Sequence, residues 1–227
     1  MAPAIDLPSL SFLDAERSMP LMKLPLRTVL IDTPDGRILF SPASTLTPAQ
    51  HASAGAISDI VVPSLMHFDG VRPAVAAHPE ARLWGPEGAE AKLPGVRWHG
   101  ILGRDPWPFE DQLSLVPIAG MPKFNECVFL HRPSRSLLVT DLAFNLEDPR
   151  GLGAWLFLHL FGTYRRFGVS RLFVRFVQDR PAFDAAIAQV AALPFEHLVP
   201  SHGAIVSHDA KARFVAALRE RGVHAHA

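Results

Sequence analysis

Apolar residues along the chain fall into short runs separated by turn residues and into longer stretches with helical spacing. The short runs are rich in aliphatic residues, and those that are apolar on both faces, such as 59–63, indicate strands buried on both sides. Pro34-Asp35-Gly36 supplies the backbone angles of a hairpin turn between the first two runs. The predicted strands are 26–33, 37–40, 59–63, 82–84, 113–117, 126–131, 136–141 and 195–200.

The longer stretches predict helices. Thr47-Pro48 has the cap and first residue of a short helix, and 152–166 is apolar around most of its circumference. Segment 172–177 fits a strand or a helix. Further helices are expected at 70–77, 87–93, 181–193 (with Asp179 as N-cap) and 209–221.

This order of strands and helices predicts an α/β layered sandwich with the sheets inside and the helices outside. Residues 1–25 hold several prolines without a clear period, so we expect an N-terminal arm draped over a single domain of residues 26–227.

Composition narrows the partners. The 227 residues hold 22 basic and 22 acidic side chains, so no net charge favours nucleic acid. Cys127 is the only cysteine, which excludes an intrachain disulfide and a cysteine-based zinc cluster. The N-terminal residues lack a secretory pattern, and the apolar run 152–161 is about half a membrane span. We therefore expect a cytoplasmic protein with no membrane span and a small-molecule substrate.

Potential metal ligands follow three of the predicted strands. His67 and Asp69 come after one buried strand, Asp141 ends a second, and His202 follows a third. In layered α/β folds, sites gather at the carboxyl ends of buried strands. Zinc, iron and manganese need three or four imidazole or carboxylate donors that converge from separate segments. The pattern predicts a metal site built from these four residues.

The same residues resemble motifs of the metallo-β-lactamase superfamily. His67-Phe68-Asp69 is similar to the core of its His-x-His-x-Asp-His motif, 137–141 to its strand ending in a metal-bridging aspartate, and 200–203 to its segment with the last histidine. Order and spacing agree over residues 26–222. Segment 126–142 resembles more narrowly an uncharacterised bacterial branch, a domain of unknown function. The resemblance implies an αββα four-layer sandwich.

The chain departs from that motif at three histidine positions. Leu65 and Gly70 stand where the superfamily has histidines, and Gly120-Met121-Pro122 replaces its Gly-His-Thr loop. The resemblance then implies a reduced, mononuclear site with His67, Asp69, Asp141 and His202 as ligands. Two imidazoles and two carboxylates suit one divalent ion, zinc first, with iron(II) or manganese as alternatives.

The function predicted from this site is metal-dependent hydrolysis of an ester, lactone, thioester or phosphodiester of a small molecule. The metal would activate a water and polarise a substrate oxygen, and Asp69 would act as general base. The missing histidines also favour an alternative, a non-catalytic protein of the same fold without metal, acting as a binding or structural module. A redox site with a single non-haem iron is a third hypothesis.

Other polar and aromatic residues have structural interpretations. Glu126 and His131 are expected to orient loops by hydrogen bonds, and Cys127 to pack in a strand. Trp155, Phe157 and Phe161 of the apolar helix are candidate pocket or lid residues. An apolar helix face that stays exposed would also favour a homodimer.

Overall fold

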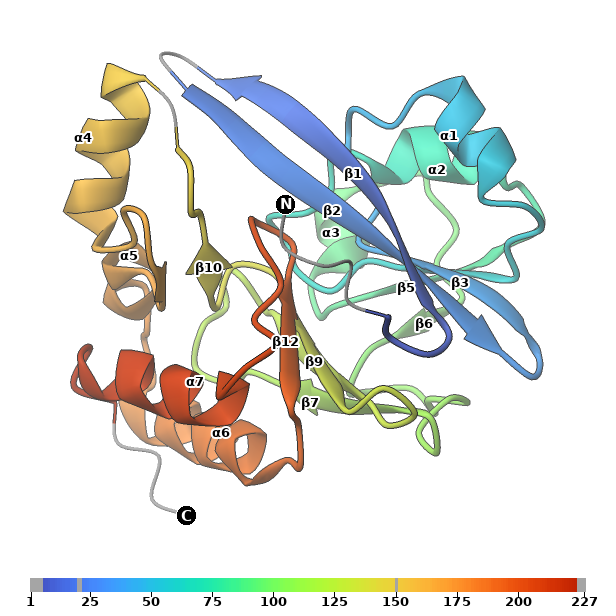
Figure 1. The fold of residues 1–227 in the computed structure, drawn as a ribbon. Coiled ribbons are helices and arrows are strands. Elements are labelled where there is room, and N and C mark those ends of the chain that lie inside the picture. The colour runs from blue at the N-terminus through green and yellow to red at the C-terminus, as the bar shows by residue number, and fades with distance from the viewer. Residues whose placement is uncertain (1–5, 20–21, 150, 224–227) are drawn as a thin grey trace.

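Two mixed β-sheets form the centre of the molecule (Figure 1). The computed structural model describes residues 6–19, 22–149 and 151–223. The first sheet has the order β1 (Leu10–Met19), β2 (Met22–Thr33), β3 (Gly36–Phe40), β4 (Asp59–Val61), β5 (Arg82–Gly85) and β6 (Gly100–Ile101). The second has the order β12 (His197–Pro200), β9 (Ser136–Val139), β8 (Cys127–His131) and β7 (Leu113–Pro117). A separate pair joins β10 (Phe144–Asn145) to β11 (Phe167–Gly168).

Each sheet contains parallel strands whose carboxyl ends share one edge. β3, β4, β5 and β6 run parallel to one another after the antiparallel pairs β1–β2 and β2–β3. In the second sheet β12 is parallel to β9, and β9, β8 and β7 are antiparallel. The backbone N–H of Arg27 in β2 donates to the carbonyl of Ser201, which directly follows β12, at 2.9 Å. The two sheets therefore meet where β12 ends.

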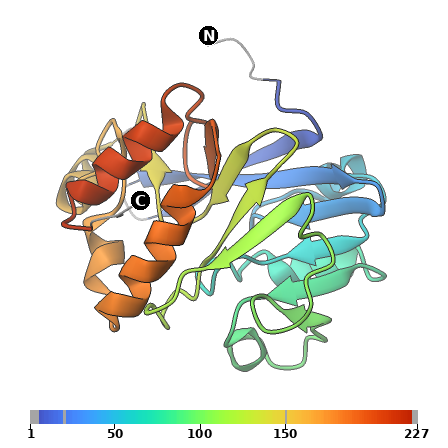
Figure 2. The same cartoon turned by 90° about the horizontal axis from the view of Figure 1, so that it is seen from below.

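Helices cover the outer faces of both sheets (Figure 2). On the first sheet, α2 (Val71–Ala77), α3 (Ala89–Lys92) and the residue that follows α1 (Pro48–Ser53) contribute to one apolar cluster. On the second, α6 (Arg180–Ala192) and α7 (Ala210–Arg219) contribute to another. A third cluster fills the space between the sheets. The predicted αββα four-layer sandwich is confirmed.

Alternation along the strands explains why their sequences are continuously apolar. In β4, Val61 points into the layer between the sheets and Ile60 packs under the outer helices. In β9, Leu138 lies between the sheets, and Leu137 and Val139 pack against α6 and α7. Successive side chains of a strand point to opposite faces, so a strand covered on both sides needs apolar residues at every position.

Residues 10–19 are regular, contrary to the irregular arm expected from the sequence. β1 pairs with β2 in antiparallel register from Leu10–Ile31 to Met19–Met22. Most β1 side chains are half-buried or exposed because β1 is the edge strand of its sheet. Residues 1–5 and 20–21 of the predicted arm lie outside the described residues. The prediction failed because the pairing of β1 is specified by its neighbour and not by a period of its own.

The predicted apolar helix is α4 (Leu152–Phe161), which ends at Gly162 in a left-handed conformation (φ 71°) rather than at residue 166. Ala154 and Leu158 pack against the start of β2. The ambiguous segment after it is helical, as α5 (Arg171–Arg175), with Ser170 as its cap. Phe161 is half-buried, and five further apolar side chains of α4 stay exposed, namely Leu152, Trp155, Leu156, Phe157 and Leu160. Because this apolar face of α4 is exposed, the homodimer stays a prediction.

Several local predictions are confirmed. Thr47 caps α1 with a capping box, and Asp179 caps α6 through the backbone N–H of Ala182. Cys127 is buried between the sheets, where burial raises the pKa of its thiol, so it packs as an apolar side chain. Within the described residues, none of the helices combines the length and the apolar character that crossing a bilayer requires.

Replacing buried His131 should change the acid sensitivity of the fold. Burial lowers the pKa of this imidazole from 6.5 to about 4, and its Nδ1 lies 2.6 Å from the Ser134 hydroxyl. Since the unfolded chain binds the proton more tightly, this histidine favours folding above pH ~6.5, and the contribution is lost as the pH falls toward ~4. We expect His131→Asn to reduce the loss of unfolding free energy between pH 7 and pH 4.5 by on the order of 2 kcal/mol.

Urea denaturation at both pH values measures this difference. The matched control is His208→Asn, which removes an exposed histidine and should keep the wild-type pH dependence. If the unfolding free energy fell equally with pH in the His131 variant and in the wild type, another group would control acid unfolding.

Candidate metal centre

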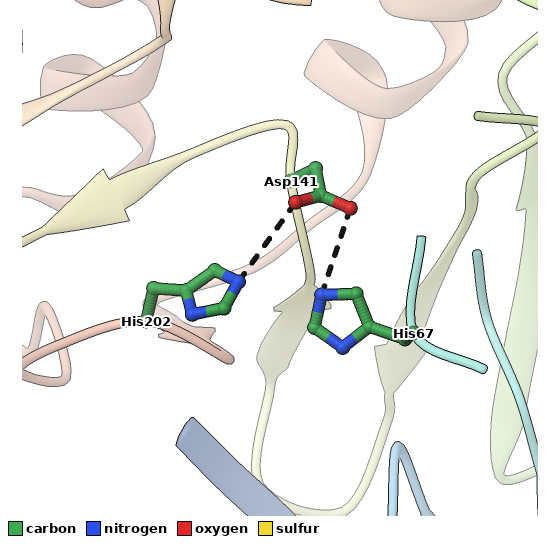
Figure 3. A group of neighbouring side chains, drawn as sticks. All are labelled: His67, Asp141 and His202. Carbon is green, nitrogen blue, oxygen red and sulfur yellow. Dashed lines mark ion pairs between the residues drawn. The ribbon is translucent and has the colours of Figure 1, made fainter. Parts of the chain in front are cut away.

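Three side chains from separate loops converge on one point (Figure 3). The Asp141 carboxylate lies between two imidazoles, with Oδ2 3.5 Å from His67 Nε2 and Oδ1 3.8 Å from His202 Nε2. One ligand atom of each residue lies within 4.8 Å of the other two. The loops after β4, β9 and β12 carry these side chains. Three of the four predicted ligands therefore lie close together, as expected for functional groups at the ends of buried strands.

The spacing of the three donors fits a metal ion better than direct hydrogen bonds. Both N···O distances exceed the usual 2.7–3.2 Å of a hydrogen bond. Two ligands bound tetrahedrally to one ion at ~2.1 Å stand roughly 3.4 Å apart. The donor set, two imidazole nitrogens and a carboxylate, is also one that zinc accepts when it keeps a fourth position open.

His202 is oriented by the first sheet. Its Nδ1 lies 3.0 Å from the backbone carbonyl of Pro25 in β2. A carbonyl can only accept, so Nδ1 donates to it, and Nε2 is the ring nitrogen that faces Asp141. The Phe144 ring stacks on the imidazole at 5.0 Å. The guanidinium of Arg27 donates to the carbonyl of Gly203 at 2.7 Å, which fixes the next residue of the loop.

His67 is held by a residue with a strained backbone. Ser41 Oγ lies 3.0 Å from His67 Nδ1, and Ser41 has a φ of 53°, a left-handed conformation that costs a non-glycine residue energy. Its backbone N–H donates to the carbonyl of Val61 at 2.8 Å, and its carbonyl accepts from the Thr28 hydroxyl at 3.1 Å. These bonds fix the hydroxyl that orients His67, and strain of this kind collects at functional sites.

The Asp141 loop is tied down by the buried carboxyl group of Glu126. The Glu126 side chain accepts from the backbone N–H groups of Thr140 at 2.7 Å and of Asp141 at 3.0 Å. Ser64 Oγ donates to Asp141 Oδ2 at 3.2 Å. The prediction that Glu126 orients the loop is confirmed. His131 ends β8, which begins directly after Glu126, and it contacts the 132–135 turn instead, also as predicted.

Charge in this cluster is concentrated on Asp141. Burial, followed by the negative charge of Asp141, raises the pKa of Glu126 to about 8. Burial opposes ionisation of Asp141 as well, but the neighbouring His67 and His202 outweigh it and hold its pKa well below the usual range. Burial likewise lowers the pKa of His67, and the Asp141 charge reverses the net shift and raises it. The geometry thus concentrates one negative charge between the two histidines.

Asp69, the fourth predicted ligand, lies outside this cluster. Its carboxylate Oδ2 is 2.5 Å from Arg17 Nη1 of β1, and both side chains are about half-exposed. Sequence reasoning missed Arg17 because it treated residues 1–25 as an arm. Asp69 still lines the same cavity as His67, Asp141 and His202.

That cavity has a volume of about 470 Å³ and opens beside the three converging side chains. Its walls come from the β1–β2 hairpin, α4, α5 and the loops after β3 and β4. Phe157 and Phe161 of α4 line it, which confirms them as pocket residues, whereas Trp155 lies on the outer side of the helix. The volume is within the range of small-molecule sites.

Solved structures identify this architecture. The chain superposes on the metallo-β-lactamase from Pontibacter korlensis with a TM-score of 0.65 at 13% identity, over 95% of this chain and 97% of that chain. The metallo-β-lactamase from Erythrobacter litoralis gives a TM-score of 0.59 at 15% identity, over 95% of each chain. The chain has the metallo-β-lactamase fold. The metal-soaked Flv1 flavodiiron core from Synechocystis sp. PCC6803 superposes with a TM-score of 0.66 at 12% identity, over 96% of this chain and 60% of that chain.

Sequence comparison adds no family to this fold. No protein-family model matches the chain, and no curated protein matches it.

In this metallo-β-lactamase fold, neighbouring residues pack around the three positions where the sequence departs from the superfamily motif. Leu65 packs under the outer helices of the first sheet, and Met121 packs against α6. A side chain at Gly70 would place its Cβ 2.0 Å from the backbone oxygen of Pro42. At each position, packing contacts therefore take the place of a histidine. His67, Asp141 and His202 remain as the converging set.

Proposed function

We propose that this protein is a metal-dependent hydrolase with one divalent ion held by His67, Asp141 and His202. The observation that carries the proposal is the pair of N···O distances, 3.5 and 3.8 Å, with His202 Nε2 presented toward the carboxylate. Zinc suits this donor set best among the candidate ions. When bound, the ion supplies an activated water and a positive charge for a substrate oxygen.

The protein's own groups prepare the site for this chemistry. Asp141 concentrates negative charge where a cation would sit, and Glu126 and Ser64 hold its carboxylate in place. Pro25 and Ser41 fix the ring nitrogens of His202 and His67 that do not face Asp141. Such outer partners typically change metal affinity or activity by 10–100-fold. The fold can then position a substrate oxygen beside the three ligands from the cavity side.

Metal content and activity test the proposal together. Protein stripped with a chelator should regain about one equivalent of zinc, iron(II) or manganese, and hydrolysis of p-nitrophenyl acetate should return with the metal. Protein that takes up no metal and shows no hydrolysis would support the non-catalytic alternative. Metal uptake without hydrolysis of esters, thioesters or lactones would leave the site as a binding module and contradict the enzymatic proposal.

Asp69 is proposed as the general base, since it is the carboxylate of the cavity that stands outside the cluster. Accepting a proton from the attacking water would require it to separate from Arg17, and both groups are exposed enough to move. We expect Asp69→Asn to lower kcat by on the order of a hundredfold with metal content unchanged. Arg17→Gln is the matched control because it frees Asp69 and should preserve activity. Loss of metal in Asp69→Asn would instead make Asp69 a ligand.

A further inference from the structure

The walls of the cavity beside the three ligands are mostly apolar, and their uncharged polar residues are Ser18, Ser41, Ser44, Thr163 and Ser170. Three elements supply them, the β1–β2 hairpin, α4 and α5, and Phe144 and Phe124 close the inner side. Figure 1 shows the hairpin reaching toward α4, and Met22 of β2 packs against Ala154 and Leu158 of that helix. The apolar lining residues of these elements are Met19, Met22, Leu24, Leu26, Phe157, Leu158, Phe161, Leu172 and Phe173.

The charged groups of the cavity outside the cluster are already paired. Among the lining residues in the described part of the chain, they are Arg17, Arg27 and Asp69. Arg17 pairs with Asp69. Arg27 Nε lies 2.9 Å from Asp14 Oδ1, and Arg27 Nη1 lies 2.7 Å from the carbonyl of Gly203. Before any substrate enters, both arginines among these residues are engaged by protein groups, so neither forms a ready phosphate site, which favours a neutral carbonyl group over a phosphodiester at the ligands.

We propose that the substrate is a carbonyl compound, an ester, thioester or lactone, whose long apolar chain lies in this cavity with its carbonyl at His67, Asp141 and His202. The proposal rests on the function proposed above. The driving force is burial of the chain against Leu, Met and Phe side chains, worth about 0.8 kcal/mol per methylene, or about fourfold in affinity. Hydrolysis adds water across the acyl C–O or C–S bond and releases a carboxylic acid and an alcohol or thiol, so no further reactant is needed.

Binding can be measured apart from hydrolysis. Straight-chain alcohols of 4 to 14 carbons would displace a fluorescent dansyl fatty acid from the Asp141→Ala protein, in which the proposed chemistry is disabled. We expect affinity to rise about fourfold per methylene until the cavity is filled. Affinity that does not depend on chain length would overturn the proposal.

Two pairs of variants separate the cavity from the exposed face of α4. Leu172 lines the cavity and is 36% exposed, so Leu172→Trp can narrow the cavity without a buried clash. We expect it to weaken binding of the 12-carbon alcohol at least tenfold, while Leu160→Trp on the exposed face leaves it unchanged. Phe157→Ala, at a lining residue, should likewise weaken binding where Leu156→Ala does not. If the two variants of either pair weakened alcohol binding equally, the apolar chain of the ligand would lie on the outer face of α4, which would contradict the proposal.

The wild-type enzyme completes the test with p-nitrophenyl esters of 2 to 12 carbons. We expect kcat/KM to rise with acyl length in the wild type and in Leu160→Trp, and the rise to be lost in Leu172→Trp. Chain-dependent binding without hydrolysis of any ester would leave this inference standing and contradict the proposed function. Metal-dependent hydrolysis of the acetate ester with no preference for longer chains would contradict this inference and leave the proposed function standing.

Discussion

Asp141→Ala is expected to abolish metal binding. The carboxylate lies between the two imidazoles, with its oxygens 3.5 Å from His67 Nε2 and 3.8 Å from His202 Nε2. Its removal takes away one of three ligands and the negative charge that favours a cation. Because a structural zinc site is worth roughly 10–16 kcal/mol in total, losing one ligand should lower affinity about a thousandfold or more. Elemental analysis after dialysis against the metal should fall from about one equivalent to a background level.

A matched control separates the ligand from a nearby carboxylate. Asp69→Asn removes a negative charge from the same cavity but leaves the three converging atoms in place. It should retain its metal. Circular dichroism of Asp141→Ala checks that the fold is intact, which we expect because the substitution leaves every side chain of the apolar clusters in place. Unchanged metal content in a folded Asp141→Ala protein would refute the site.

The fold was largely accessible from the sequence because its strands are buried on both faces. After their first residue, strands β4 and β9 are apolar on both faces, and such runs are visible without any knowledge of their partners. β1 lacks this property. It is an edge strand whose side chains are mostly half-buried or exposed, and its register comes from ten residue pairs with β2. Because apolar and polar residues do not alternate along the strands of this hairpin, their pairing leaves no periodic signal in the sequence.

The candidate site was accessible from the sequence in its three converging residues, in Glu126 and in two aromatic residues of the cavity wall. His67, Asp141 and His202 are chemically distinctive and follow apolar runs, so their positions could be read directly. The groups that orient the two imidazoles carry no such mark. The carbonyl of Pro25 is available at any residue, and Ser41 looks like an ordinary loop serine until its φ of 53° is known. Nonlocal support of this kind follows from the meeting of the two sheets and not from local sequence.

The partner of Asp69 shows the same limit. Sequence reasoning gave Asp69 a place among the ligands because it follows His67 by two residues. The structure puts it against Arg17, which lies 52 positions away along the chain. Which carboxylate joins the imidazoles depends on how each loop leaves its strand. For Asp141 that direction is set by the hydrogen bonds that the backbone N–H groups of Thr140 and Asp141 donate to Glu126, whereas Asp69 points toward β1.

Gly70→Ala is expected to destabilise the protein severely. An alanine Cβ at this position would lie 2.0 Å from the oxygen of Pro42, 2.7 Å from its carbonyl carbon and 2.9 Å from the carbonyl carbon of Ala43. All three are backbone atoms, so relief requires the loops after β3 and β4 to separate. We expect unfolding free energy to fall by about 3 kcal/mol or more, measured by urea denaturation.

Gly95→Ala is the matched control, because a Cβ there meets nothing within 4 Å and only the positive φ of 79° opposes it. It should cost about 1 kcal/mol. Equal losses in the two variants would mean that contact with Pro42 is not what requires glycine at position 70. The same contact bears on function, since a histidine carries the same Cβ. Gly70→His should therefore unfold the loop that holds His67 and lower metal content below one equivalent. A stable Gly70→His protein with two equivalents of metal would show that packing does not limit this chain to one ion.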